Sequence, residues 1–304
     1  MSVRITSTAI SRGGETIGIV AHSGRAARLC LERAGVRPDQ VGVLINTGVF
    51  RDSNTLEPAV AALIQKEAGI GLEYAVDDPR TFAFDLMNGA TGVLEAVRVA
   101  TSILETGSTE YVLIVSGDTH PSLTRPTATA EFPYATCGAA MLLGRTEEPA
   151  GFGTVRSVAG AGTPAVEGYV DTAAMGTTGR GAMTIVREDD FAERLLAVAV
   201  EAAAGVLAES EAGETGDLAL LTSTPTTDFG VRLADALGID RTHVRAPDLT
   251  DGDPHTAALT AAFDRAVADD TLTGYRRVLF VAAGAGPSAA AVLYRLPAPA
   301  GVPA

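Results

Sequence analysis

Residues 84–97 read Phe-Asp-Leu-Met-Asn-Gly-Ala-Thr-Gly-Val-Leu-Glu-Ala-Val, and this stretch predicts the centre of the fold. The apolar run 82–87 is typical of a buried strand. It ends in the small residues 88–92 and passes directly into an apolar helix over 93–104. Such a sharp strand-to-helix turn places its apex at the helix N-terminus. Free backbone N–H groups and the positive end of the helix dipole favour negative charge there.

The apex of this turn is Ala90. A nucleophile or an oxyanion is usually placed at such a position, yet a methyl group has no nucleophilic or acid–base chemistry. The turn also lacks the Gly-x-Ser-x-Gly pattern of hydrolases. The sequence therefore predicts a site whose backbone is suited to catalysis and whose apex side chain is not.

Charge and composition exclude several classes of partner. The 304 residues carry a formal net charge of −14, which argues against nucleic acid and against an anionic membrane surface. No stretch is long and apolar enough to span a bilayer. Two cysteines, Cys30 and Cys137, do not make a disulfide framework, so we expect a reducing cytoplasm.

No cofactor or metal motif is present in the sequence. Four scattered histidines and two distant cysteines provide no metal-binding spacing. The glycine turn 284–286 precedes an expected strand rather than a phosphate-binding helix, which argues against a dinucleotide. We therefore expect neither a cofactor nor a metal.

Apolar strand patterns alternate with helical patterns along the chain, which predicts a parallel α/β architecture. We expect strands at 15–20, 41–46, 82–87, 111–116, 136–143, 218–222, 278–283 and 289–296. We expect helices at 57–68, 93–104, 191–209, 229–237 and 256–267, and one more between residues 20 and 37. The second half repeats the order of the first. We therefore expect an internal duplication into residues 1–158 and 159–304.

These features resemble the thiolase-fold condensing enzymes, in their ketoacyl-acyl-carrier-protein synthase III branch. The resemblance covers nearly the whole chain and rests on the elbow 84–92, the strand region 134–143, the segment 237–239 and the terminal region 278–295. It implies an α/β fold of duplicated α/β/α/β/α layers with two mostly parallel, mixed five-stranded sheets.

The chemistry of that family needs a cysteine, a histidine and an asparagine. Carried over by position, the three fall on Ala90, Ser223 and Asp253. All three groups are thus replaced. Ser223 is a candidate substitute nucleophile that would need a nearby base. Asp253 is a candidate acid or base, or else an ordinary aspartate before a helix.

Two further features of the family survive the loss of these side chains. Its oxyanion hole is backbone, which here implies the N–H groups of Ala90 and Ala285. The loop before Glu57 resembles a sub-branch that joins two fatty acyl thioesters, where a glutamate supplied across the dimer interface acts as base. Glu57 matches that position, although it equally suits the first turn of a helix.

Other residues around the elbow are expected to contact substrate. Asn88, Gly89 and Thr91 belong to the turn, and the histidines His120 and His255 are candidate pocket residues. The ordinary alternatives are a loop histidine at His120 and a residue that caps the following helix at His255.

The resemblance implies a protein that handles acyl thioesters, on coenzyme A or an acyl carrier protein, in specialised metabolism of the polyketide or fatty-acid type. Acyl transfer or condensation would run without the Cys-His-Asn set. The alternative is a non-catalytic partner subunit that pairs with a cysteine-containing paralogue. The fold implies a homodimer or heterodimer, without nucleic acid or membrane as partner.

Overall fold

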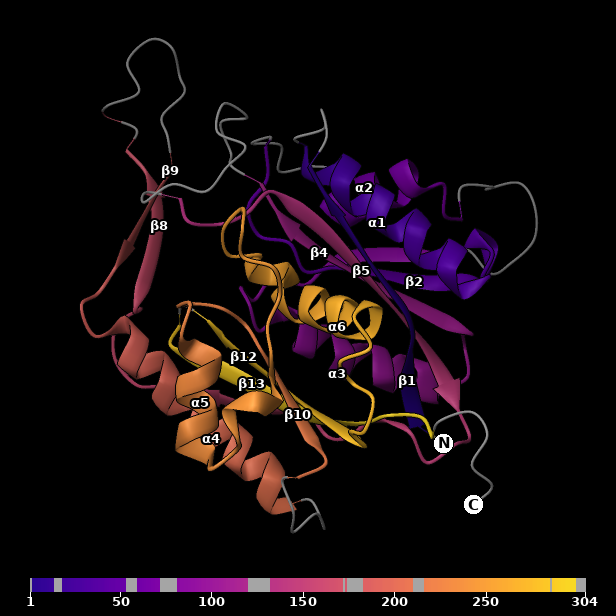
Figure 1. Cartoon of the computed structure of the whole chain (residues 1–304). Coiled ribbons are helices and arrows are strands. Elements are labelled where there is room, and N and C mark those ends of the chain that lie inside the picture. The colour runs from indigo at the N-terminus through magenta and orange to yellow at the C-terminus, as the bar shows by residue number, and fades with distance from the viewer. Residues whose placement is uncertain are drawn as a thin grey trace.

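The computed structural model describes residues 2–13, 18–52, 59–71, 81–119, 132–171, 173, 183–209, 216–284 and 286–298. They form two sheets with a layer of helices between them and further helices on both outer sides (Figure 1). Among the described helices, none combines the length and the apolar character that a membrane crossing needs.

The first sheet has five strands in the order β1-β5-β4-β2-β3. In that order they are Ser2–Arg12, Cys137–Thr146, Tyr111–Asp118, Val41–Asn46 and Phe82–Asp85. Strand β2 pairs in parallel with both β3 and β4, whereas β5 runs antiparallel to β1 and β4. Every residue of β2 is buried, as expected for a strand covered on both faces.

The second sheet follows the order β11-β10-β12-β13, with β6 and β7 both paired to β13. These strands are Val244–Arg245, Leu218–Thr222, Arg277–Gly284, Ser288–Arg295, Gly151–Phe152 and Arg156–Ala159. Because β6 and β7 pair with successive parts of β13, they share one edge position. The second sheet therefore repeats the order of the first, with this split edge in the place of β1.

The fold class is confirmed, with two differences in detail. The second sheet holds six strands rather than five, because its edge strand is broken in two. Each sheet is also less parallel than expected. The turn between β12 and β13 is too short for a crossover, so β13 must return antiparallel. The expected division after residue 158 falls inside β7.

In the part of the chain that the structure describes, six α-helices complete the layers. Helices α1 (Ile19–Ala34) and α2 (Val60–Ala68) pack on the outer face of the first sheet. Helices α4 (Phe191–Glu209) and α5 (Phe229–Leu237) do the same for the second. The largest core cluster lies between the sheets and is built around α3 (Gly92–Glu105) and α6 (Ala258–Ala268). The order of layers is therefore α/β/α/β/α.

A separate hairpin and the short 3₁₀ helices η1 (Pro38–Gln40), η3 (Arg241–His243) and η4 (His255–Ala257) lie outside this scheme. The hairpin pairs β8 (Val166–Val170) with β9 (Met183–Arg187) and leads into α4. Figure 1 shows it projecting from the second half.

One expectation near the N-terminus is wrong, and one strand there was not predicted. Strand β1 was not expected, although its buried residues partly alternate. The strand expected at 15–20 is contradicted at its described end, because Ile19 begins α1. The Asp52 carboxylate accepts a hydrogen bond of 2.9 Å from the Ile19 N–H. Because the residue that fixes this helix start is 33 positions away in the chain, the sequence around Ile19 does not indicate where the helix begins.

Candidate functional site

The elbow is held in place by the last residue of β3, Asp85. Its carboxylate accepts hydrogen bonds from the backbone N–H groups of Val60 and Ala61, at 2.9 and 2.8 Å. It also accepts one from the side chain of Asn46, at 2.9 Å. A single carboxylate thus ties the strand before the elbow to β2 and to the N-terminus of α2.

The turn itself requires a glycine. Gly89 has φ +52°, a left-handed conformation that a side chain would strain. The Thr91 hydroxyl donates to the Asn88 carbonyl at 2.7 Å, and the Gly92 N–H donates to the Gly89 carbonyl at 3.1 Å. Ala90 is consequently held at the entrance to α3.

The second half of the chain meets the elbow at Ala90. A Cβ built on Gly284, the last residue of β12, would lie 3.7 Å from the Ala90 backbone nitrogen and 3.8 Å from the Thr91 methyl group. The site therefore lies where the two duplicated halves touch. Ala285 follows in sequence but is outside the described residues, so its oxyanion role stays a prediction.

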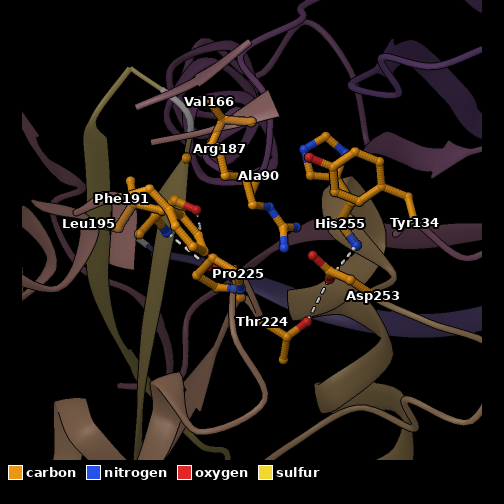
Figure 2. Close-up of a pocket in the computed structure, with 13 residues that line it drawn as sticks. Ala90, Tyr134, Val166, Arg187, Phe191, Leu195, Thr224, Pro225, Asp253 and His255 are labelled. Atoms are coloured by element: carbon orange, nitrogen blue, oxygen red, sulfur yellow. Dashed lines mark hydrogen bonds between the residues drawn. The ribbon is translucent and has the colours of Figure 1, made fainter. Parts of the chain in front are cut away.

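A small pocket opens at this contact (Figure 2). Its polar lining includes Tyr134, Arg187, Asp253 and His255, which come from three separate segments. The other lining residues are Ala90, Val166, Phe191, Leu195, Ser223, Thr224, Pro225, Ala283 and Gly284. The cavity volume is about 30 Å³, space for roughly two to three water molecules. An acyl group therefore needs movement of the lining to enter.

Asp118, the last residue of β4, is the most heavily hydrogen-bonded carboxylate near the pocket. It is 0% exposed. One oxygen accepts from the backbone N–H groups of Val49 and Phe50, at 3.1 and 2.7 Å. The other accepts from the Thr256 hydroxyl at 2.6 Å and the Thr256 N–H at 3.2 Å. It also lies 3.1 Å from Nδ1 of His255.

His255 is oriented on several sides. Asp118 holds Nδ1, and the Tyr134 ring stacks on the imidazole at 4.2 Å between centroids. The Phe50 ring is 5.6 Å away. The opposite nitrogen, Nε2, lies toward the elbow, 3.9 Å from the position of a Cβ built on Gly89. Nε2 forms no hydrogen bond with any residue in the described part of the chain.

The charges around His255 favour its protonated form. Burial opposes that form, but the Asp118 carboxylate, through its charge and its hydrogen bond, outweighs burial and raises the pKa of His255. The Asp253 carboxylate acts in the same direction. Burial would also raise the pKa of Asp118, but the charge of His255 and the bonds from His255, Phe50 and Thr256 leave it below its ordinary value.

Asp253 lies next to His255 in the pocket (Figure 2). Its carboxylate accepts from the Thr224 hydroxyl at 2.6 Å and from the His255 N–H at 2.8 Å (Figure 2). Burial raises the pKa of Asp253 despite these bonds and the nearby positive groups. Of the two carboxylates beside His255, Asp118 therefore has the lowered pKa and Asp253 the raised one.

Arg187 brings a positive charge into the pocket from the end of β9. Its guanidinium lies over the Phe191 ring, 5.0 Å from the centroid, a cation–π arrangement. Figure 2 shows it pointing toward Asp253, on whose carboxylate it acts electrostatically. The β8–β9 hairpin is thus one wall of the pocket.

Ser223 is buried, and its hydroxyl bonds to the backbone of β12. It accepts from the Ala283 N–H at 2.9 Å and donates to the Ala283 carbonyl at 3.3 Å. The Ser223 N–H in turn donates to the Val281 carbonyl at 3.0 Å. This geometry favours a structural role that continues the pairing of β10 with β12.

The structure gathers part of the expected site. Around one pocket it places Ala90, Ser223, Asp253 and His255, with Asn88, Gly89 and Thr91 in the adjoining turn. Glu57 and His120 lie outside the described residues, so their roles stay predictions. The sequence did not single out Asp118, Tyr134 or Arg187 as site residues. Of these three, only Asp118 could have been recognised from the sequence, because it lies at the end of a buried strand.

The cysteines contribute no reactive group. Cys30 and Cys137 are both buried and unpaired, and burial raises the pKa of each thiol to about 12. Within the described ranges, no cluster of His, Cys, Asp or Glu has the arrangement of a metal site.

We therefore expect iodoacetamide at pH 8 to leave the folded chain unmodified, because the thiolate is the reacting form. In denaturant both cysteines should react, which mass spectrometry would show as two added groups. Alkylation of either thiol in the folded chain at the denatured rate would contradict this burial.

Comparisons with known proteins agree with this architecture. A family profile described as 3-oxoacyl-[acyl-carrier-protein (ACP)] synthase III matches residues 84–161. A beta-ketoacyl-[acyl-carrier-protein] synthase III of Streptomyces lividans is 25% identical over 99% of this chain and 86% of that protein. The solved priming beta-ketosynthase of the R1128 polyketide pathway superposes with a TM-score of 0.80 at 20% identity, over 97% of this chain and 96% of its own.

A shorter match is to a different enzyme. An acyl-CoA:acyl-CoA alkyltransferase of Xanthomonas campestris pv. campestris is 32% identical over 95 residues, which are 31% of this chain. The matched segment spans 25% of that protein.

Proposed function

Because the chain belongs to the ketoacyl synthase III-like family of the thiolase fold, we propose that it handles acyl thioesters at the pocket beside Ala90. The acyl group would arrive on coenzyme A or an acyl carrier protein in the cytoplasm, in metabolism of the polyketide or fatty-acid type. Acyl transfer or condensation would then run directly between two bound partners.

The observation that carries this proposal is the arrangement at the elbow. Ala90 occupies the N-terminus of α3, so the position offers backbone donors but no side chain that could take an acyl group. Ser223 uses its hydroxyl in bonds to β12. Bringing two reactants together in a fixed geometry can still lower a barrier by about 7–11 kcal/mol.

The proposal is tested by following thiol release. The purified chain is incubated with acetyl- to palmitoyl-coenzyme A, first alone and then with a second acyl-coenzyme A, malonyl-coenzyme A, an alcohol or an amine. We expect free coenzyme A to appear with at least one thioester only when an acceptor is present. No release above the uncatalysed rate with any pair would overturn the proposal.

A second candidate function is a non-catalytic partner subunit. Two observations favour this alternative: the elbow residue Ala90 has no nucleophilic side chain, and the first sheet has an exposed edge. Strand β3 is that edge, and its surroundings expose Phe82 (64%) and Met87 (54%). Exposed apolar side chains on an edge strand suit an interface with another chain. We propose that β3 pairs with a second condensing-type chain, either another copy or a paralogue.

Replacing Phe82 with aspartate should weaken this association, because it removes apolar contact and brings like charges together across a two-fold axis. Light scattering after gel filtration should show a shift from dimer to monomer. Val267→Asp is the matched control, since Val267 is 55% exposed on α6. A variant that stays dimeric, like its control, would rule out β3 as the interface.

Glu57 belongs to the same proposal. If the chain pairs through β3, Glu57 is a candidate base supplied to the partner's site, as the family resemblance implies. His120 stays a candidate pocket residue.

A further inference from the structure

We propose that His255, positioned by Asp118, is the general base that takes the proton of a protic acceptor, an alcohol or an amine, during acyl transfer beside Ala90. This inference rests on the proposed function and narrows its acceptor to groups with O–H or N–H. His255 stands outside the three positions that carry the chemistry of the family.

The two ring nitrogens of His255 have different surroundings and therefore different roles. Nδ1 faces Asp118, so in the neutral imidazole it carries the hydrogen that this carboxylate accepts. Nε2 then carries the lone pair, on the ring edge that lies toward Gly89 and the elbow. A buried carboxylate that fixes the tautomer and direction of a histidine is the arrangement that general bases require.

The step balances without any further reactant. The acceptor oxygen or nitrogen attacks the thioester carbonyl carbon while Nε2 of His255 takes its proton. The carbon–sulfur bond then breaks, and the protonated imidazole returns that proton to the leaving thiolate. The products are an ester or amide and a free thiol. Asp118 keeps its charge throughout and stabilises the imidazolium formed in between.

The backbone of His255 adopts an uncommon conformation. His255 has φ +48°, in the left-handed region, which residues other than glycine adopt uncommonly and which asparagine, aspartate and histidine adopt more often than the rest. This conformation is held by the bond from the His255 N–H to Asp253 and by the Asp118 contact. The Asp118 contact holds the imidazole ring so that it lines the pocket, a placement that a helix-capping role would not require.

The charged groups that face His255 set its pH response. They are Asp118 from β4, Asp253 from the segment before η4 and Arg187 from β9, and the Tyr134 ring covers one face. Because the carboxylates outweigh burial and Arg187, the pKa of His255 lies above its ordinary 6.5. A base must be neutral to accept a proton, so kcat/KM should rise with pH through this raised pKa.

The test is His255→Gly with and without added imidazole. Glycine suits the positive φ, and removing the ring leaves space for the free base. We expect kcat/KM to fall by roughly 10²- to 10⁴-fold. Free imidazole should restore it at least partly, and the restored rate should rise with the pKa of the substituted imidazole used. Asp270→Gly is the matched control, since Asp270 also has positive φ and lies exposed after α6.

Each outcome decides a separate claim. Loss of turnover with recovery in imidazole supports the base. A His255→Gly chain that turns over normally, or that folds but gains nothing from any imidazole, overturns it and leaves the proposed function standing. A wild-type chain that consumes no thioester with an alcohol or an amine overturns the inference. In that case, thiol release with a second acyl-coenzyme A or with malonyl-coenzyme A decides whether the proposed function stands. If His255→Gly does not fold, His255→Asn replaces it, because asparagine tolerates positive φ.

Discussion

Replacing Asp118 with alanine is expected to lower the free energy of unfolding by about 3–5 kcal/mol, the usual cost of removing one partner from a buried ion pair. The substitution leaves the N–H groups of Val49, Phe50 and Thr256 without their acceptor. It also leaves His255, whose side chain is only 13% exposed, without its counter-charge. Urea unfolding followed by circular dichroism measures the loss.

The size of this loss should depend on pH. The lowered pKa of Asp118 means that its stabilisation is present above the unfolded pKa and is lost as pH falls toward the folded value. The raised pKa of His255 means that its stabilisation is present below about pH 6.5 and is lost as pH rises through the folded value. The gap between wild type and variant should therefore be largest between about pH 4 and 6.5.

Asp269→Ala is the control for this measurement. Asp269 is a half-exposed aspartate that pairs with Arg265 on α6, and such surface pairs contribute under about 1 kcal/mol. If Asp118→Ala were no less stable than Asp269→Ala, Asp118 would not hold the pocket together as described.

Replacing Ala90 with cysteine should convert the elbow into an acyl acceptor. A thiol at the N-terminus of α3 would have its pKa lowered by the helix dipole, and it would face the same pocket as His255. After incubation with short acyl-coenzyme A thioesters, we expect the mass of Ala90→Cys to rise by one acyl group per chain. The two native cysteines are buried and should not react.

Ala283→Cys is the matched control for this experiment. Ala283 lines the same pocket and is equally buried, but it lies on β12 and not at a helix N-terminus. It should stay unmodified. A folded Ala90→Cys chain that no acyl thioester modifies would show that the pocket does not admit these substrates.

The sequence predicts the architecture well because its signals are local. Continuous apolar runs identify β2 and β10, and the small residues before α3 identify the elbow. The duplicated order of the strands follows from the same patterns. Strand β1 was not predicted because apolar and polar residues alternate only partly along it, and polar residues such as Thr8 occupy buried positions.

The site is only partly predictable, since its key contacts join the two halves. Asp118 and His255 are 137 positions apart, and neither residue belongs to a motif that would link them. The role of Ser223 depends on the register between β10 and β12, which sets its hydroxyl against the Ala283 backbone. Arg187 reaches the pocket only because the β8–β9 hairpin folds against it. These contacts depend on how distant segments of the chain are brought together in the fold, which local sequence patterns do not show.

The central claim is that acyl groups pass directly from thioester to acceptor without an acyl-enzyme. Intact-mass spectrometry of the wild-type chain, sampled while it consumes an acyl-coenzyme A with its acceptor, tests this claim most directly. We predict that the mass of the chain stays unchanged while thiol is released and acylated acceptor accumulates. A mass gain of one acyl group that digestion locates on a residue such as Ser223 or Thr91 would contradict it.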